Sequence, residues 1–429
     1  MTYGPIDDLD LQATIAQVLD RWPSAGLAVA VIRGGELAWF HGHGLADIPA
    51  KTPITEDTVF RIASITKTFT AIAVTQLWEQ GLVDLDAPAN DYLRAFRLAP
   101  RKPNLRPATV RHLLTHTAGV GYLRRLSDLL QPGVGSGDRA GRSGAQPFAD
   151  YYRRGLPVEI EPGTKWVYSN HGFAALGQIV EDVSGQPLDR YLRDRIFDPL
   201  GMEHTDLIRS ERVRSNLATG YVLHRRGLKP VADREVPTPG GDGMYSTTAD
   251  MARYVTALLR RAAIQHGSVL RPESVATMFR PHFQPDPRVP GMGLGFELGK
   301  EGDHRTVGKT GVLSGFLSAI ALAPEDGIGV IVLGNTGGLD GRGDPCRSQP
   351  CSFVSCSAFP LTQSASTFRR APKPGAKSAG GTARPRSGHQ PVLEGADGCR
   401  SRGRCSGRPP DAEATDPDPS DETRLPPVP

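Results

Sequence analysis

Apolar residues near the start of the chain follow first a helical and then a strand-like pattern. Residues 8–21 place their apolar side chains near helical spacing, and Pro23 stops the pattern, which predicts an amphipathic helix. Two apolar runs follow, at residues 27–32 and 36–40, on either side of a Gly-Gly pair. Strand-like runs around such a pair are typical of a β-hairpin.

The next apolar stretch, residues 65–80, is helical in pattern and ends at Gly81, a residue suited to a helix C-terminus. From there to about residue 240, Pro and Gly punctuate short helical patterns separated by long loops. A flexible segment is predicted at residues 131–146. The best helical patterns of this part of the chain are residues 110–114, 173–184 and 188–197.

The pattern changes again toward residue 340. A helix is predicted at residues 248–261 behind a capping sequence, and three strands follow at residues 306–312, 316–323 and 328–333. Strands at both ends with helices between predict an α/β fold: one antiparallel sheet built from both chain ends and flanked by helices, with a mostly helical domain inserted. We assign residues 1–82 and 241–340 to the α/β part and 83–240 to the insert, with the site in the cleft between them.

Composition separates residues 341–429 from the rest. This tail contains 14 Pro and 10 Gly but only 9 Leu, Ile, Val and Phe, a level typical of chains that cannot bury a core. All five Cys lie in it, so the body, residues 1–340, has no disulfide framework and no Cys-based metal cluster. Two interpretations of the tail stand side by side: a disordered segment, or a frame-shifted read of GC-rich coding sequence.

The distribution of charged residues limits the kinds of partner that the body can bind. The tail has 13 Lys and Arg against 9 Asp and Glu, which leaves 37 of each sign in the body. A body without net charge offers no basic face for nucleic acid. Residues 1–10 lack the basic start of a secretory signal, and no apolar run reaches the ~18 to 20 residues that span a bilayer, so we expect a cytoplasmic protein that does not associate with membranes.

Three short motifs occur in an order that describes one acyl-transfer site. Ser64-Ile-Thr-Lys67 opens an apolar helix, so Ser64 and Lys67 share one face beside the positive end of that helix. A serine hydroxyl needs a base to take its proton, and Lys67 serves if it is neutral or if it lowers the pKa of a second base. Tyr168, in Tyr168-Ser-Asn170, is the candidate second base, and Asn170 can hold Lys67 or a substrate amide by hydrogen bonds.

The third motif, Lys309-Thr310-Gly311, lies in a predicted strand. A free tyrosine titrates near pH ~10, so cations on both sides, Lys67 and Lys309, are needed to favour the Tyr168 phenolate. Gly311 is expected to leave room for a substrate along the strand. The backbone N–H groups of Ser64 and Val312 are expected to form an oxyanion hole, a device worth ~3 to 4 kcal/mol per donor.

These motifs resemble those of the serine β-lactamase-related superfamily, which includes class C β-lactamases, D-alanyl-D-alanine carboxypeptidases, D-aminopeptidases and carboxylesterases of the same fold. The resemblance extends over roughly residues 6–337. Residues 113–119, 161–170 and 241–250 also match the family's habits. It implies that Ser64 is the acylated nucleophile, that Lys67 and Tyr168 form the base pair, and that Lys309, Thr310 and Gly311 belong to the substrate-binding strand. It implies no cofactor and no metal.

Each residue also has a plainer interpretation. Ser64 could be a helix N-cap and Lys67 a solvated charge, but the presence of the other two motifs in the same chain favours the catalytic interpretation. No Gly-x-Ser-x-Gly elbow exists to pair with His116, which is therefore predicted to order its loop by hydrogen bonds. His41 and His43 are weak evidence for a metal site.

The leading functional hypothesis is a serine hydrolase, most consistent with a carboxylesterase on small esters or amides. A β-lactamase, a D,D-carboxypeptidase or a D-aminopeptidase is the alternative within enzymes. A ligand-binding relic of the fold without catalysis is the alternative from another class. The oligomeric state is left open.

Overall fold

The structure, a computed structural model, describes residues 6–337 apart from residues 7, 122–151, 153, 225–226, 234–235, 237, 261–262 and 265–266. These residues belong to one compact unit. The predicted flexible segment at residues 131–146 and the tail at 341–429 lie outside the described residues.

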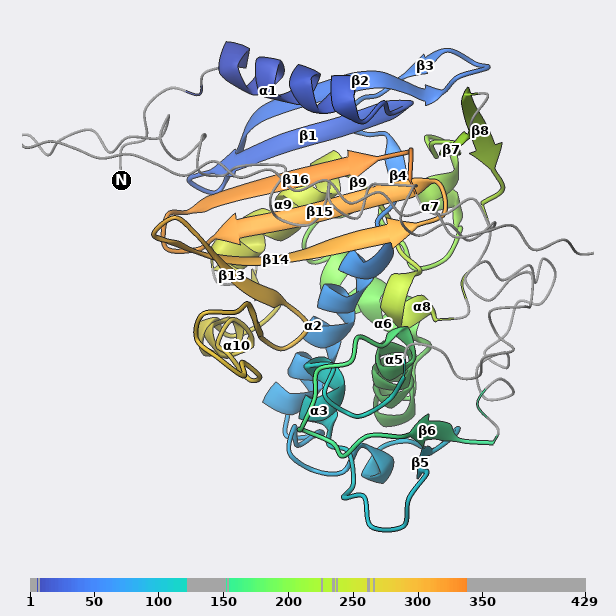
Figure 1. The fold of residues 1–429 in the computed structure, drawn as a ribbon, viewed down its shortest axis with the longest axis vertical. Helices are drawn as coiled ribbons and strands as arrows, with labels where there is room; N and C mark the ends of the chain where they lie inside the picture. The colour runs from blue at the N-terminus through green and yellow to red at the C-terminus, as the bar shows by residue number, and fades with distance from the viewer. Residues whose placement is uncertain are drawn as a thin grey trace, which may run out of the picture. The chain divides into compact units, whose positions relative to one another are not determined.

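The main element is an eight-stranded antiparallel sheet with the order β12-β13-β14-β15-β16-β1-β2-β3 (Figure 1). Strand β1 lies between its hairpin partner β2 and β16, with Leu27 opposite Gly334. The sheet thus joins the two ends of the described chain, as the sequence predicts, and the predicted fold class is confirmed. Its strands are β1 (Gly26–Arg33), β2 (Glu36–Asp47), β3 (Thr52–Pro53), β12 (Gly291–Met292), β13 (Glu297–Glu301), β14 (His304–Leu313), β15 (Phe316–Ala323) and β16 (Ile328–Gly334).

Short strand pairs tie the connecting segments together. Three are antiparallel and one, β5 with β6, is parallel. They are β4 (Val59–Arg61) with β9 (Tyr245–Thr247), β5 (Leu98–Pro100) with β6 (Leu156–Val158), β7 (Gly220–His224) with β8 (Gly227–Val231), and β10 (Ala263–Ile264) with β11 (Gly267–Ser268).

The predicted helices are present close to their predicted ranges, but the structure differs in several places. The helix predicted at residues 173–184 begins at Asn170, and the short helices at residues 211–214, 239–242 and 272–278 were not predicted. The helix predicted at residues 65–80 is preceded by a 3-10 turn, and the one predicted at 188–197 continues from α6 as a π-helical turn, η4. The helices are α1 (Asp8–Arg21), α2 (Thr66–Glu79), α3 (Val110–Leu114), α5 (Asn170–Ser184), α6 (Leu188–Leu192), α7 (Glu211–Arg214), α8 (Pro239–Asp242), α9 (Thr248–Leu259) and α10 (Pro272–Met278). The shorter turns are η1 (Ala63–Ile65), η2 (Ala89–Asp91) and η4 (Arg193–Phe197).

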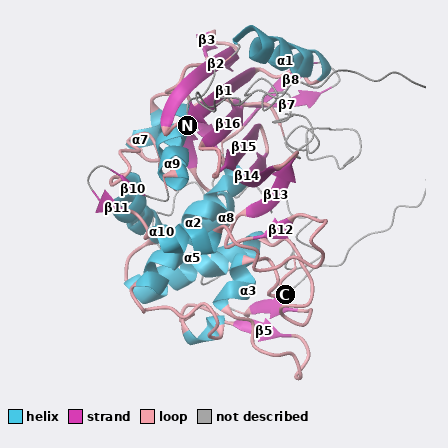
Figure 2. Ribbon diagram, turned by 90° about the vertical axis from the view of Figure 1, so that its left-hand side faces the viewer, coloured by secondary structure: helices cyan, strands magenta, loops and turns pink. Residues whose placement is uncertain are grey.

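Helices cover both faces of the sheet. On one face, Ile15 of α1 packs with Leu27, Val29 and Val332, so α1 lies along β1 and β16 (Figure 1). On the other face, α9 contacts β16, β1 and β15, and Figure 2 shows α2, α3, α5 and α10 gathered below the sheet. Among the described residues, no helix combines the length and apolar character needed to cross a bilayer.

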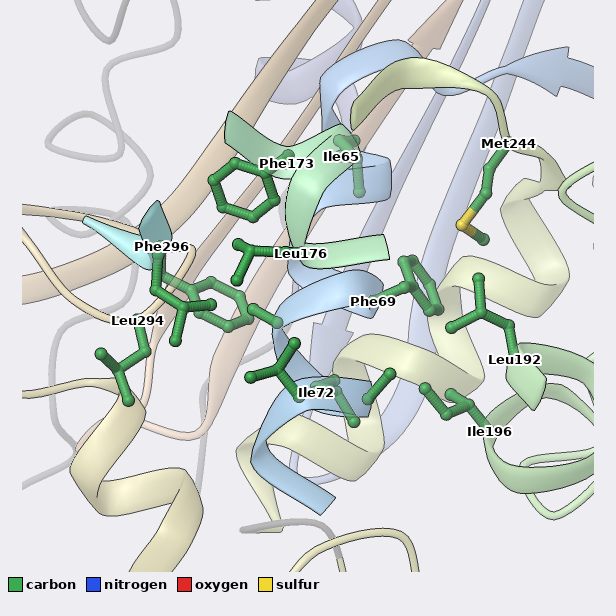
Figure 3. Close-up of a cluster of buried hydrophobic side chains, with 14 of the residues drawn as sticks. Ile65, Phe69, Ile72, Phe173, Leu176, Leu192, Ile196, Met244, Leu294 and Phe296 are labelled. Atoms are coloured by element: carbon green, nitrogen blue, oxygen red, sulfur yellow. The ribbon is translucent and has the colours of Figure 1, made fainter. Parts of the chain in front are cut away.

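Helix α2 runs through the middle of the helical part and is buried on nearly all sides. Figure 3 shows Phe69 of α2 beside Leu192 of α6, while Leu176 of α5 lies on the other side of α2. The Phe69 ring stacks on Tyr254 at 4.0 Å between centroids. Each such buried side chain contributes about 1.5–3 kcal/mol. This packing fixes α2 from all directions, and with it the position of the turn η1 at its start.

Candidate active site

Ser64 lies in η1, where the helical part meets the sheet. The residue before it, Ala63, has a positive φ of 46°, an uncommon conformation for a residue with a Cβ. The turn is held from two sides: the amide of Ile62 donates to the Met244 carbonyl at 3.0 Å, and the Ile62 carbonyl accepts from the Ser318 hydroxyl at 2.7 Å. Such backbone strain persists only where the surroundings determine it, which is the case here.

Lys67 is fully buried one helical turn after Ser64. Its Nζ donates to Ser64 Oγ at 3.0 Å, to Asn170 Oδ1 at 2.7 Å and to the Gly241 carbonyl at 2.7 Å. Three acceptors match the three donors of an ammonium group. Burial lowers the pKa of Lys67, because desolvation penalises the charged form, whereas the nearby groups of Tyr168 and Asp242 oppose that shift.

Tyr168 contacts the same serine from the other side. Its hydroxyl lies 2.7 Å from Ser64 Oγ. The ammonium groups of Lys67 and Lys309 lie 4.9 Å and 5.1 Å from the centre of its ring. The predicted arrangement, a tyrosine between two lysines, is therefore present.

His116 supports Tyr168 and the backbone that follows it. Its ring packs at 4.5 Å from the Tyr168 ring, and its Nδ1 accepts a hydrogen bond from the Ser169 amide at 3.2 Å. Burial, with the two site lysines, holds the pKa of His116 well below 6.5, so the ring is neutral. Its backbone φ is 58°. The prediction that His116 orders its loop is confirmed.

Asn170 opens α5 and lies between a cation and an anion. Its Oδ1 accepts from Lys67, and its Nδ2 donates to Asp242 Oδ2 at 3.3 Å. The second oxygen of Asp242 accepts from the Thr238 hydroxyl at 2.7 Å. Burial raises the pKa of Asp242, and the charge of Lys67 opposes that shift.

Lys309 reaches the site from β14 with a side chain that is only 2% exposed. Its Nζ forms an ion pair with Glu297 Oε1 at 2.6 Å. Glu297 belongs to the neighbouring strand β13, where it pairs with Gly308, and its side chain is 37% exposed. The cation predicted beside Tyr168 is therefore shared with a carboxylate.

Gly311 lies against η1. A Cβ at this position would lie 2.4 Å from Ser318 Oγ, 2.6 Å from the Ile62 carbonyl oxygen and 2.9 Å from the Ser64 amide nitrogen. Glycine at this position therefore lets β14 approach the backbone of Ser64 closely. This approach brings the strand that carries Val312 alongside the Ser64 amide, where the predicted oxyanion hole would lie. The expectation that Gly311 also leaves room for a substrate stays a prediction.

Thr310 and Val312 stand apart from the side-chain cluster. Successive strand residues face opposite sides of a sheet, so the Thr310 side chain lies on the face away from Lys309 and Gly311. There it pairs with Ala319 and lines a cavity of about 590 Å³ over the outer face of the sheet. The Val312 side chain is 40% exposed, which leaves its backbone as the part that could serve the site.

Sequence reasoning missed Glu297 and the individual roles of Gly241 and Asp242. Gly241 and Asp242 lie in residues 241–250, a stretch that resembles the family. The role of Gly241 could not be predicted from residue type, because every residue has a backbone carbonyl that can accept a hydrogen bond. Glu297 could be found only from the register of β13 on β14, which short strands do not reveal. Within the described part of the chain, no group of three or more His, Cys, Asp and Glu forms a possible metal site.

The assembled site places one hydroxyl between two basic groups at the start of a buried helix. Such an arrangement suits attack of Ser64 on a carbonyl carbon, since both Lys67 and Tyr168 lie within hydrogen-bond reach of the proton to be removed.

Comparisons with known proteins place the chain among esterases and beta-lactamases. Esterase EstB of Burkholderia gladioli is 34% identical over 281 residues, which cover 58% of this chain and 69% of the esterase. A beta-lactamase of Yersinia enterocolitica is 26% identical over 353 residues, which cover 75% of this chain and 85% of that protein.

Solved structures show the same fold. The octameric penicillin-binding protein homologue from Pyrococcus abyssi aligns with a TM-score of 0.69 at 27% identity, over 84% of this chain and 78% of that one. EstCE1, a hydrolase with promiscuous acyltransferase activity, aligns with a TM-score of 0.64 at 26% identity, over 77% and 94%. The beta-lactamase family model matches residues 11–347. The chain therefore belongs to the beta-lactamase family and is a serine hydrolase of that fold.

Proposed function

We propose that this protein is a carboxylesterase that cleaves small esters through an acyl-enzyme at Ser64. The observation that carries the proposal is the double contact of Ser64 Oγ, with Lys67 Nζ at 3.0 Å and the Tyr168 hydroxyl at 2.7 Å. Few structural roles require a buried serine to contact both a candidate base, Tyr168, and a buried ammonium group, Lys67.

In the proposed reaction, Ser64 Oγ attacks the ester carbonyl carbon while its proton passes to the oxygen of Tyr168, which acts as the base with the Lys67 and Lys309 ammonium groups close to its ring. The carbonyl oxygen becomes an oxyanion next to the Ser64 and Val312 amides. When the intermediate collapses, the C–O bond to the alcohol breaks and the alkoxide takes the proton back from Tyr168. Water then attacks the acyl-enzyme by the same steps in reverse, releasing the carboxylic acid and restoring Ser64.

The charges around Ser64 favour uncharged esters over anionic substrates. Lys309 is already paired with Glu297 at 2.6 Å, and Asp242 lies near Lys67. Two cations are thus matched by two carboxylates, so an anionic group entering the site would compete with Glu297 for Lys309. A β-lactamase or D,D-peptidase activity, whose substrates carry a carboxylate, remains the second candidate because two relatives bear the name beta-lactamase.

The test is intact-mass spectrometry after exposure to p-nitrophenyl acetate and, separately, to a chromogenic cephalosporin. We expect an acetyl adduct on Ser64 that forms and turns over, with slow or no release of the cephalosporin chromophore. Ser64→Ala serves as the control and should remain unmodified.

Rapid turnover of the cephalosporin with little ester hydrolysis would replace the esterase proposal by the β-lactamase alternative. No adduct with either compound, together with no labelling by a fluorophosphonate probe, would leave a binding relic as the function of this fold.

A further inference from the structure

Asp242 is a buried carboxylate one side chain away from Lys67. It lies at the C-terminal end of α8, and the carbonyl of its neighbour Gly241 accepts directly from Lys67 Nζ at 2.7 Å. Between the carboxylate and the lysine lies the carboxamide of Asn170, which contacts both. Asp242 thus reaches Lys67 through its own backbone neighbour and through one side-chain amide.

The chemistry of the three groups allows one orientation of the amide. An ammonium group can only donate hydrogen bonds, so Lys67 requires the Oδ1 of Asn170. A carboxylate can only accept, so Asp242 requires the Nδ2. Asp242 is in turn held by the Thr238 hydroxyl on its other oxygen, at 2.7 Å. Both oxygens therefore face donors, which is the pattern of an ionised carboxylate.

We propose that Asp242 is a positioning residue of the acyl-transfer site: its carboxylate orients Asn170 and thereby aims Lys67 at Ser64. This inference rests on the proposed function. Without the carboxylate, the Nδ2 of Asn170 loses the acceptor that fixes the amide in place, so its Oδ1 is no longer held toward Lys67. The Lys67 ammonium then loses one of its three acceptors and its fixed direction toward Ser64.

A polarity swap tests this chain of contacts. Asp242→Asn places a second amide beside Asn170, so one buried donor is left without an acceptor. We expect kcat for p-nitrophenyl acetate to fall about 10- to 100-fold, the range that corresponds to an unsatisfied buried group. The double variant Asn170→Asp/Asp242→Asn restores the pattern, since the carboxylate now at position 170 accepts from Lys67 while the amide now at position 242 donates to that carboxylate. We expect its kcat, on the plateau of its pH profile, to recover at least tenfold over Asp242→Asn. Failure to recover would overturn the proposal.

The pH profile separates positioning from general stabilisation. The charged or titratable groups that act on Lys67 are Tyr168, Asp242 and Lys309, and His116 nearby is neutral. Asp242→Asn removes a negative charge from the surroundings of the base, so the acid limb of its pH profile should move to lower pH. In the double variant, a carboxylate lies directly against Lys67, so the limb should move to higher pH. A limb that stays in place in both would overturn the proposal.

Thr238→Val is the matched control. It removes the other hydrogen bond to Asp242 and conserves the side-chain shape, so it loosens the same segment without touching Asn170. We expect lower stability, with kcat within about threefold of the parent protein and an unmoved acid limb. A loss of kcat equal to that of Asp242→Asn would show that both residues act only through the stability of this segment, against the proposal.

A thermodynamic cycle keeps this inference distinct from the proposed function. Urea unfolding of the two single variants and the double variant measures the coupling of residues 170 and 242 without substrate. Coupling in stability supports the orienting contact, and additive effects overturn it. If the parent protein hydrolyses no ester, the proposed function fails, whereas the cycle still decides whether Asp242 orients Asn170.

Discussion

Tyr168→Phe removes one oxygen atom from the site and leaves the aromatic ring in place. The lost hydroxyl lies 2.7 Å from Ser64 Oγ, while the ring keeps its packing against His116 at 4.5 Å. A positioned acid or base contributes about 10²- to 10⁴-fold, so kcat/KM for p-nitrophenyl acetate should fall by this factor, or about 2.7–5.4 kcal/mol. Stability should change far less, by about 1 kcal/mol, since one half-buried hydrogen bond is lost.

Tyr254→Phe makes the same chemical change away from Ser64. The Tyr254 hydroxyl contacts the Thr68 hydroxyl at 2.7 Å, and its ring stacks on Phe69. This control should lose about 1 kcal/mol in urea unfolding and retain kcat/KM within about threefold. Steady-state hydrolysis and unfolding curves of both variants decide the matter. If Tyr168→Phe keeps more than about a tenth of the parent kcat/KM, Tyr168 is not the base and its role is packing.

Four further changes test other parts of the site. Ser64→Ala should abolish ester turnover and fluorophosphonate labelling while the melting temperature stays within a few degrees, and residual turnover above a few percent would indicate another nucleophile. Gly311→Ala should lower kcat at least tenfold and destabilise by about 1–3 kcal/mol, because its Cβ would collide with Ser318 and the backbone of η1; Gly334→Ala, where a Cβ meets nothing nearer than 3.5 Å, should be mild in both assays. Glu297→Gln should raise kcat/KM for an aryl ester with a carboxylate in its acyl chain about tenfold relative to the neutral ester, because Lys309 gains a free charge-assisted donor, and an unchanged ratio would contradict the charge argument. His116→Asn places a residue that tolerates positive φ at this position but removes a group whose pKa is lowered on folding. The free energy of unfolding should therefore decrease less than in the parent protein as the pH falls below about 6.5. Equal slopes of unfolding free energy against pH would refute the lowered pKa of His116.

Local patterns in the sequence were sufficient for the elements that carry the nucleophile. Ser64 and Lys67 are separated by one helical turn, so their contact at 3.0 Å follows from helix geometry alone. The strand with Lys309 follows from its apolar alternation. Tyr168 contacts these residues only in the folded protein, because it lies about a hundred residues further along the chain. Its place in the site was predicted from the occurrence of three motifs together, since the local geometry of one segment could not predict such a contact.

The remaining features depend on long-range contacts or on backbone atoms. Glu297 meets Lys309 because β13 pairs with β14 in one register, and a shift of a single residue would turn its side chain to the other face. The role of Gly311 could be seen only once η1 lay against the strand. The positive φ of Ala63 has no residue-type signal, because alanine is not a residue that favours this conformation.

The pairing of β1 with β16 affects how the chain folds during its synthesis on the ribosome. Leu27 can pair with Gly334 only after nearly all of the described chain has been synthesised. The strand that contains Lys309 is likewise synthesised long after Ser64. At about 5–20 residues per second, the growing polypeptide waits tens of seconds for these strands. Until then α9 has neither β15 nor β16 to pack against. Late formation of these long-range contacts delays folding and leaves apolar surface exposed in an aggregation-prone intermediate. A chain interrupted before β14 would hold its serine and its lysine, yet it would have neither the strand beside them nor the sheet that shelters them from chaperones and proteases.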